Sequence, residues 1–406
     1  MIEKQSEIVY IIQPITDSRY KILHEEAVAL IESAGASYAG TIYQNIREIN
    51  PATYIGEGKL AKLRERLSDL DVTVLFNGDL SPSQTLNISA ALDGKKVIDR
   101  TTLILDIFAM RAESSEGKLQ VELAQLKYLY PRLKGKGEAL SRLGGGIGTR
   151  GPGESQLETD RRHIRRRIHT LEQRLLETEK RRKMQSDRRK KDKVKTIALV
   201  GYTNTGKSTL LNALTGANVF VKNALFATLD PTARGFEIDG VPFLLVDTVG
   251  FLQDLPHSLI EAFRSTLESA LNCDLALIVC DAGGEYETQL NTTLTTLSEM
   301  NFSSPYLIVM NKCDTCADVS ALPKDCVCIS AKNGQGFERL KSEIMKKLSE
   351  EFIYATLFVP FSEAGEWSAL RPYYFEKSVS YSDDGSEISA VIPKIYAEYF
   401  RKFIKK

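Results

Sequence analysis

The sequence predicts an α/β protein whose largest part is a mostly parallel sheet with helices on both faces. A smaller α/β domain and a long antiparallel helical hairpin are expected to precede it. Apolar runs alternate with stretches of helical period in residues 1–110 and again from Lys195 onward, as in α/β folds. Between these regions, apolar residues recur every three or four positions over two long stretches, as in paired helices.

The amino-terminal region predicts a small α/β domain. The runs Ile8–Ile12 and Val72–Phe76 have the composition of buried strands. Ser18–Ser33 and Lys59–Leu70 have the helical period, and Thr102–Phe108 is a further apolar run. Strand-like and helical segments therefore alternate here.

Residues 111–194 predict the hairpin. Its two apolar stripes are Leu119, Leu123, Leu126, Tyr130 and Leu133, and Leu157, Ile164, Ile168, Leu171 and Leu175. The second helix is basic, because Ser155–Lys195 contains 16 Lys or Arg against 7 Asp or Glu. A solvated helix face would explain such a run, and so would a partner rich in phosphate.

The loop between the two helices, residues 134–153, contains eight glycines and can bury little apolar area. It has one acid, Glu138, and four basic residues: Lys134, Lys136, Arg142 and Arg150. A flexible linker would explain the glycines alone. The basic residues favour contact with nucleic acid, because backbone amides and Lys or Arg side chains are the groups that bind phosphates.

The remainder predicts two further parts. Residues 195–349 repeat strand, loop and helix, whereas residues 350–406 predict a small α/β subdomain. Within this subdomain, Asp383-Asp384-Gly385 is typical of a tight turn between two short strands.

The composition is that of an ordinary globular protein, with 406 residues, 43% hydrophobic, 26% charged and no net charge. No apolar run reaches the roughly 18 residues that a membrane-spanning helix needs. The first residues lack the basic flank and cleavage site of a secretory signal. We therefore expect a soluble, cytoplasmic protein, and a monomer.

The six cysteines all lie between Cys273 and Cys328. Cys313-x-x-Cys316 followed by Cys326-x-Cys328 has a short spacing for a zinc ribbon. Buried, reduced thiols are the expected state.

A phosphate-binding loop is expected after the strand Thr196–Val200. Gly201-Tyr202-Thr203-Asn204-Thr205-Gly206-Lys207-Ser208 has the pattern G-x-x-x-x-G-K-S, and a helix is expected over Thr209–Thr215. Backbone amides and the helix N-terminus of such a loop surround the β-phosphate. Lys207 is expected to reach the β- and γ-phosphates, and the Ser208 hydroxyl to ligate Mg²⁺.

A second carboxylate follows the strand Val241–Val246, in the segment Asp247-Thr248-Val249-Gly250. Asp247 would hold Mg²⁺ through water, and the Gly250 amide would meet the γ-phosphate. The first switch is expected at Phe226-Ala227-Thr228-Leu229-Asp230, where Thr228 could complete the Mg²⁺ shell. The second switch is expected at Gly250–His257, in which we expect His257 to be structural.

Two further motifs select the base. Asn311-Lys312-Cys313-Asp314 follows the strand Tyr306–Met310, and the Asp314 carboxylate can accept two hydrogen bonds from guanine N1–H and N2–H₂. Ser330-Ala331-Lys332 follows the strand Asp325–Ile329 and offers an amide to guanine O6. Four motifs in this order, each at the end of a strand, predict GTP and GDP as ligands.

Lys207, Asn204, Thr228 and Gly250 are expected to carry the hydrolysis of GTP. Phe251 occupies the position where many GTPases have a glutamine that orients the attacking water, so intrinsic hydrolysis should be slow or organised differently. Asn204 could hold a monovalent cation such as K⁺ near the phosphates, or it could only stabilise the turn. The sequence leaves both roles open.

The motifs GYTNTGKST, FATLDPTAR and DTVGFLQDLPHSLIEAF resemble the HflX family of ribosome-associated GTPases. The similarity continues in NPATYIGEGKL, LSPSQTLNI, VIDRTTLILDIFAMRAESSEGKLQVELAQLKYLYPRL and SRLGGGIGTRGPGESQLETDRRHIRRRI. It covers nearly the whole chain and is weakest before Asn50 and after Glu350. Thr205, where the family often has alanine, and the cysteine-rich stretch depart from the pattern.

The resemblance implies binding to the large ribosomal subunit, GTPase activity stimulated there, and splitting of stalled ribosomes. It also implies that the tip of the hairpin approaches ribosomal RNA, and that the basic loop and the basic helix make the contact. ATP-dependent activity is attributed to the amino-terminal region in parts of the family; here Gly56-Glu57-Gly58-Lys59 is not a P-loop, and ATP binding stays open.

Two other functions stay open. One is a GTPase that supports tRNA modification, which would carry a folate- or flavin-type substrate domain that the sequence does not indicate. The other is an RNA-binding protein regulated by guanine nucleotide. In that case, replacement of Lys207 by Ala would leave its cellular role intact.

Overall fold

The computed structural model describes residues 6–141, 152–191, 194–216, 225–256, 259, 271–316 and 318–404. Contacts divide the chain into two compact units. The first comprises residues 1–185, 222–230 and 252–266, and the second comprises residues 186–221, 231–251 and 267–406. The glycine-rich stretch 142–151 and His257 lie outside the described residues.

The first unit contains a parallel four-stranded sheet in the order β2-β1-β3-β4. The strands are β1 (Ile8–Ile15), β2 (Ser37–Asn45), β3 (Thr73–Phe76) and β4 (Val97–Asp99). The helices that alternate with them are α1 (Tyr20–Ser33), α2 (Glu57–Leu67), α3 (Pro82–Ala91) and α4 (Arg100–Arg111). The small α/β domain predicted from the sequence is thus present, and its apolar run Thr102–Phe108 lies within α4.

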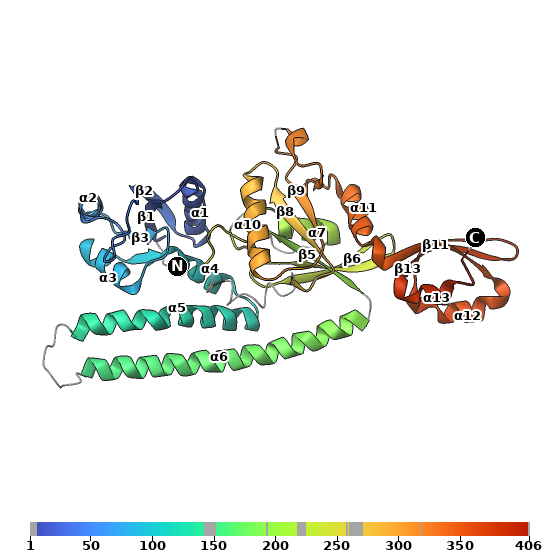
Figure 1. Ribbon diagram of the computed structural model, residues 1–406, viewed down its shortest axis with the longest axis horizontal. Helices are drawn as coiled ribbons and strands as arrows, with labels where there is room; N and C mark the ends of the chain where they lie inside the picture. Colours follow the sequence, from blue (N-terminus) through green and yellow to red (C-terminus); the bar gives the residue numbers. More distant parts are fainter. Residues whose placement is uncertain are drawn as a thin grey trace, which may run out of the picture. The chain divides into compact units, whose positions relative to one another are not determined.

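Two long helices complete the first unit, α5 (Ser115–Ser141) and most of α6 (Pro152–Lys191). They run antiparallel, side by side (Figure 1), and ion pairs join them, between Glu122 of α5 and Arg167 of α6 and between Lys127 and Glu172. Leu171 of the second predicted stripe is fully buried. The predicted hairpin is confirmed, and ion pairs at its margin reinforce its narrow apolar seam.

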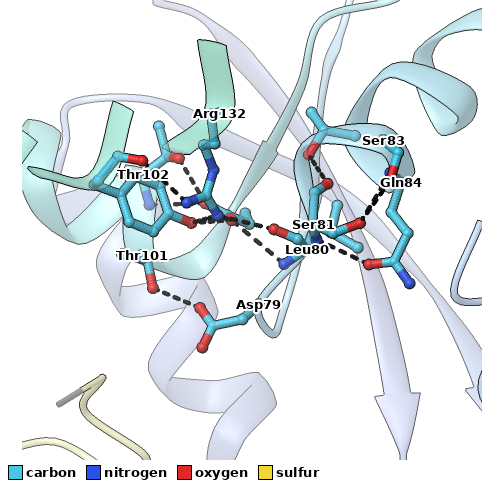
Figure 2. A network of polar contacts seen from close by, with 11 residues as sticks. Asp79, Leu80, Ser81, Ser83, Gln84, Thr101, Thr102 and Arg132 are labelled. Atoms are coloured by element: carbon cyan, nitrogen blue, oxygen red, sulfur yellow. Dashed lines mark hydrogen bonds and ion pairs between the residues drawn. The ribbon is translucent and has the colours of Figure 1, made fainter. Parts of the chain in front are cut away.

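A polar network fastens α5 to the carboxyl end of the small sheet (Figure 2). Arg132 of α5 donates to the Leu80 carbonyl oxygen at 2.8 Å and to Asp99 Oδ2 at 3.1 Å. Asp99 is buried and also caps α4, since its Oδ1 accepts from the Thr102 amide at 2.9 Å. Ser81 and Gln84 form a capping box at the start of α3. These bonds fix the hairpin to the domain from which it extends.

The second unit contains a six-stranded sheet in the order β10-β9-β8-β5-β7-β6, antiparallel only between β6 and β7. The strands are β5 (Lys195–Gly201), β6 (Thr232–Ile238), β7 (Val241–Asp247), β8 (Leu275–Asp281), β9 (Tyr306–Asn311) and β10 (Cys326–Cys328). The helices include α7 (Lys207–Thr215), α10 (Tyr286–Glu299) and α11 (Phe337–Lys347). This is the mostly parallel α/β sheet that the sequence predicts, and its carboxyl edge carries all four nucleotide motifs.

The end of the chain forms an antiparallel sheet in the order β11-β13-β12. Its elements are β11 (Phe352–Pro360), α12 (Ala364–Ala369), β12 (Phe375–Tyr381), β13 (Gly385–Pro393) and α13 (Ala397–Phe400), with short 3₁₀ turns between them. The predicted turn at Asp383-Asp384-Gly385 connects β12 to β13, and the Ser382 amide donates to the Gly385 carbonyl oxygen at 2.9 Å.

Among the described helices, none combines the length and apolar character that crossing a bilayer requires. All six cysteines are reduced, and Cys273, Cys280 and Cys326 are buried. Burial raises the pKa of the Cys280 thiol to about 12, so it packs as an uncharged group. Within the described residues, no cluster of three or more His, Cys, Asp or Glu could hold a metal ion.

Candidate nucleotide-binding site

The loop between β5 and α7 has the geometry of a phosphate cradle. Gly201, Asn204 and Gly206 have φ angles of 146°, 58° and 91°, in the left-handed region that Gly and Asn tolerate best. The loop therefore turns back over the N-terminus of α7, and the backbone amides of a helix N-terminus can bind an anion. A Cβ on Gly206 would stand 2.3 Å from Asn311 Nδ2, so only glycine fits there.

Lys207 is held inside this cradle by backbone carbonyls. Its ammonium group donates to the Tyr202 and Gly201 oxygens at 2.6 and 3.1 Å, and its side chain is buried. Burial lowers the pKa of Lys207 to about 8, although Asp247 opposes the shift. A phosphate beside Lys207 would relieve this unfavourable burial of charge.

Ser208, in the first turn of α7, faces Asp247, the last residue of β7. The Ser208 hydroxyl donates to Asp247 Oδ2 at 2.6 Å, and Asp247 is fully buried. A hydroxyl and a carboxylate that converge in this way are the hard oxygen ligands that Mg²⁺ prefers. These residues therefore fit the metal that the sequence predicts here.

Gly250 lies against the phosphate loop. A Cβ on Gly250 would meet Thr203 Cα at 2.7 Å and Lys207 Nζ at 2.9 Å, so a side chain cannot be accommodated beside the ammonium group. The neighbouring Thr248 is buried, and its hydroxyl donates to the Leu199 carbonyl oxygen at 2.7 Å. The backbone of Gly250 can consequently approach the same ligand as Lys207.

Phe251 extends the contact between this segment and the phosphate loop. Its amide donates to the Gly201 oxygen at 3.1 Å, and its own carbonyl oxygen accepts from the Thr203 amide at 2.8 Å. The Phe251 side chain is 2% exposed. The residue at the usual glutamine position therefore belongs to the core, where it cannot orient a water molecule.

Asn311 joins the phosphate loop to the base-recognition loops. Its Nδ2 donates to the Thr205 carbonyl oxygen at 2.8 Å, and its Oδ1 accepts from the Ala331 amide at 2.9 Å. Asn311 is 2% exposed and Ser330 is fully buried. Because one side chain bridges three loops, the phosphate end and the base end of the site have a fixed separation.

Lys312 depends on a residue that the sequence analysis missed. Its ammonium group donates to the Asn204 carbonyl oxygen at 2.8 Å and to Asp281 Oδ2 at 2.7 Å. Asp281 ends β8, between the strands that carry Asp247 and Asn311 in chain order. The sequence does contain a signal for Asp281, because this acidic residue stands at the end of a third apolar strand. Asp314, the predicted guanine acceptor, is exposed at the same edge.

The predicted first switch belongs to the first unit, together with residues 252–256 of the second switch. The motifs of the second unit are therefore brought together at one edge of its sheet. They are Gly201–Thr209, Asp247–Gly250, Asn311–Asp314 and Ser330–Lys332. It places Phe226–Asp230 among the elements of the first unit, where Phe226 and Leu229 are buried. The role of Thr228 as a metal ligand stays a prediction.

Three family models match successive parts of the chain between residues 22 and 312. One described as GTP-binding GTPase N-terminal matches residues 22–109, and one described as GTP-binding GTPase Middle Region matches residues 111–189. A third, described as 50S ribosome-binding GTPase, matches residues 196–312. The last match contains the phosphate loop, Asp247 and the beginning of the Asn311 motif.

Similar proteins cover most of the chain. It is 45% identical over 383 residues to GTPase HflX of Caldanaerobacter subterraneus subsp. tengcongensis, a match that covers 93% of this chain and 89% of that protein. It is 42% identical over 347 residues to GTPase HflX of Escherichia coli, covering 83% and 81%. A GTP-binding protein of Sulfolobus solfataricus, solved with GDP, is 26% identical, with 85% and 99% covered and a TM-score of 0.45.

Proposed function

The chain belongs to the HflX family of GTPases, and from this premise we propose that it binds the large ribosomal subunit and splits stalled ribosomes under stress. Hydrolysis of GTP to GDP would then release it. The observation that supports the proposal best within this chain is the basic helix α6, which is exposed along much of its length.

The arginines of α6 divide into two sets. Arg167 pairs with Glu122 at 2.6 Å, and Arg165 Nε donates to the Tyr130 hydroxyl at 3.1 Å, so both help to hold the hairpin together. Arg162 and Arg166 are exposed on the same helix. Exposed guanidinium groups on a long projecting helix suit the phosphates of folded RNA.

Steady-state GTP hydrolysis with and without purified large ribosomal subunits tests the proposal. Stimulation is expected, and it should weaken as salt rises, since each phosphate contact releases counterions. Charge reversal of Arg162 and Arg166 to Glu should reduce stimulation without changing the basal rate. The matched control reverses Lys346 and Lys347 on α11, which changes the net charge equally. Absence of stimulation at low salt would refute ribosome binding.

Ribosome splitting needs a separate measurement. Intact stalled ribosomes should separate into subunits when the protein and GTP are added, and the sedimentation profile would show the separation. If the GTP-bound and GDP-bound forms bind ribosomes equally tightly, GTP cannot drive the step, because a ligand shifts only states that it distinguishes.

We also propose the site assignments that follow from the motifs. Lys207 binds the β- and γ-phosphates, Ser208, Thr228 and Asp247 hold Mg²⁺, and Asp314 and the segment Ser330-Ala331-Lys332 recognise guanine. Magnesium would neutralise phosphate charge during hydrolysis. The division into residues 1–110, 111–194, 195–349 and 350–406 is part of the same proposal.

The last part of the proposal is that a K⁺ ion binds near Asn204. The Asn204 side chain is exposed at the mouth of the phosphate loop, and its left-handed backbone would be kept by glycine. Asn204→Gly should therefore remove the amide oxygen and preserve the turn. We expect hydrolysis by the wild type to be faster in K⁺ than in Na⁺, and this difference to vanish in Asn204→Gly. A wild-type rate that is equal in both salts would refute the cation.

A further inference from the structure

The segment of the predicted first switch is attached to the first unit at three points. The Leu225 amide donates to Ser33 Oγ of α1 at 3.0 Å. The Phe226 ring packs edge-on against Phe108 of α4, with ring centroids 4.6 Å apart. The third point is Asp230, which contacts the start of helix α5.

Asp230 binds the N-terminus of the first hairpin helix with both carboxylate oxygens. Its Oδ2 accepts from the amides of Glu113 and Ser114 at 2.9 and 2.8 Å, and its Oδ1 accepts from the Ser114 hydroxyl. Ser114 directly precedes α5, and its Oγ in turn accepts from the Gly117 amide at 2.8 Å. Ser114 thus caps the helix, and the Asp230 carboxylate in turn accepts hydrogen bonds from Ser114 and places a negative charge near the helix N-terminus.

The Asp230 carboxylate fits here because Gly117 has no side chain. A Cβ on Gly117 would stand 2.3 Å from Asp230 Oδ1 and 3.1 Å from Ser114 Oγ. Alanine is ordinarily the better residue in a helix. The glycine is therefore unfavourable for α5 alone and is explained by the approach of Asp230.

Asp230 is also close in the chain to the predicted magnesium site. Thr228 precedes it by two residues, and Thr232 follows it by two residues as the first residue of β6. Thr232 is the partner of Asp247 in the register of β6 and β7. A short length of backbone therefore links the carboxylate at the base of the hairpin to the residues expected around Mg²⁺.

We propose that Ser114 and Gly117 are positioning residues for the GTPase reaction, because they hold Asp230 and with it the first switch at the base of the hairpin. Engagement of Thr228 with the metal and γ-phosphate competes with this hold. GTP with Mg²⁺ withdraws Asp230 from α5, and GDP lets it return. The inference rests on the proposed function only in assigning Thr228 and the switch.

The two events are linked by a coupling free energy, which acts equally in both directions. Withdrawal of Asp230 removes acceptors from the amides of Glu113 and Ser114 and loosens the first turn of α5. A change in the hairpin that displaces Asp230 favours the GTP-engaged switch to the same degree. The conformation at the base of a ribosome-binding hairpin would in this way depend on whether GTP or GDP is bound.

Hydrogen exchange of the full-length protein tests this directly. Peptides that cover the start of α5 are followed with GDP and Mg²⁺, and with a non-hydrolysable GTP analogue and Mg²⁺. In the wild type we expect the first-turn amides to exchange faster with the analogue, within the roughly 5- to 150-fold range of typical couplings. Equal exchange in the two nucleotides would overturn the inference.

Gly117→Ala is the matched perturbation, because its Cβ displaces Asp230 and yet favours the helix. We expect fast exchange with either nucleotide and a higher affinity for the analogue relative to GDP. If alanine only stabilised α5, exchange would slow, and the inference would fail. Gly58→Ala in α2, with no atom within 4 Å of the added Cβ, should keep the wild-type response.

This measurement needs no ribosome. Failure of ribosomal stimulation would refute the proposed function and leave the exchange result intact. Conversely, normal stimulation with nucleotide-independent exchange at α5 would refute the positioning role alone.

Discussion

The ammonium group of Lys312 lies 2.7 Å from the carboxylate of Asp281, at the ends of the neighbouring strands β9 and β8. The same ammonium group donates to the Asn204 carbonyl oxygen in the phosphate loop. Lys312 has a φ angle of 62°, so its backbone leaves the strand sharply and its side chain runs back across the site. Asp281 thereby fixes the side chain of Lys312 against the phosphate loop.

Asp281→Asn should weaken the binding of GDP. The amide keeps the size of the carboxylate but loses the charge that holds Lys312, and both side chains are partly shielded, at 34% and 21% exposed. We expect a loss of about 1 kcal/mol, or roughly fivefold in Kd. Glu338→Gln, which removes the same charge from the exposed pair with Lys341, is the control. Equal effects of the two changes on Kd would contradict the assignment.

Gly206→Ala tests the bridge between the phosphate loop and Asn311. The new Cβ would stand 2.3 Å from Asn311 Nδ2, and Asn311 has no room to retreat because it also binds Ala331. Nucleotide affinity should fall by about 100-fold or more, as expected when a fixed polar group is displaced. Calorimetric titration with GDP would measure it.

Gly216→Ala separates this clash from backbone strain. Gly216 also has a positive φ, 65°, but no atom lies within 4 Å of its added Cβ. It should lose about 1 kcal/mol of stability and keep its affinity for GDP. A similar loss of affinity in both variants would show that strain alone is responsible.

The sequence predicted β1, β3, β5, β7, β9 and β10, the hairpin and all four nucleotide motifs because each has a local signal. The strand Thr196–Val200 is apolar throughout, and the phosphate loop has a fixed spacing. Strand β2 was missed because it is a largely exposed edge strand whose sequence, SYAGTIYQN, is mostly polar or small. Strand β4 was missed because it has only three residues.

Contacts between distant segments have no such signal. No residue near Gly117 in the sequence indicates that the carboxylate of Asp230, 113 positions further along, fills the space that a side chain at Gly117 would need. Likewise, the role of Asp281 depends on the direction in which Lys312 leaves its strand. Phe251 was correctly noted as a departure from glutamine, but only the pairing of its backbone with Gly201 and Thr203 shows that its ring is part of the core.

Restoring glutamine at position 251 should consequently not restore a water-orienting group. Phe251→Gln would bury an amide in a site that is 2% exposed, at a cost of about 2–4 kcal/mol. We expect a lower unfolding temperature and no increase in basal GTP turnover. Phe251→Leu, which stays apolar, should lose less stability. Faster turnover in Phe251→Gln would mean that the side chain reaches the phosphates.

The buried pair of Arg100 and Glu26 makes the first unit sensitive to pH. Arg100 Nη2 lies 2.6 Å from Glu26 Oε2, and the two side chains are 5% and 9% exposed. Burial raises the pKa of Glu26 from 4.5 to about 7, with a small contribution from Asp254, although Arg100 acts against the shift. The folded protein therefore binds this proton more tightly than the unfolded chain, and stability falls as pH rises from about 4.5 to about 7.

Arg100→Met should steepen this dependence. Without the guanidinium group, the pKa of Glu26 rises further, so the loss of stability continues above pH 7. At about pH 8.5 the cost should reach about 3–5 kcal/mol, as for other buried charges left unpaired. At about pH 5.5 Glu26 is mostly protonated, and the cost should be smaller. Thermal unfolding at the two pH values would measure the difference.

Lys127→Met provides the control, because Lys127 pairs with Glu172 in the same unit but both side chains are well exposed, at 49% and 40%. Its salt bridge should contribute less than about 1 kcal/mol at either pH. An equal loss at both pH values in Arg100→Met would mean that packing, and not the charge of Glu26, determines the effect. A loss confined to high pH would identify Glu26 as the group that titrates, because the folded-state pKa of that carboxyl is the one raised by burial.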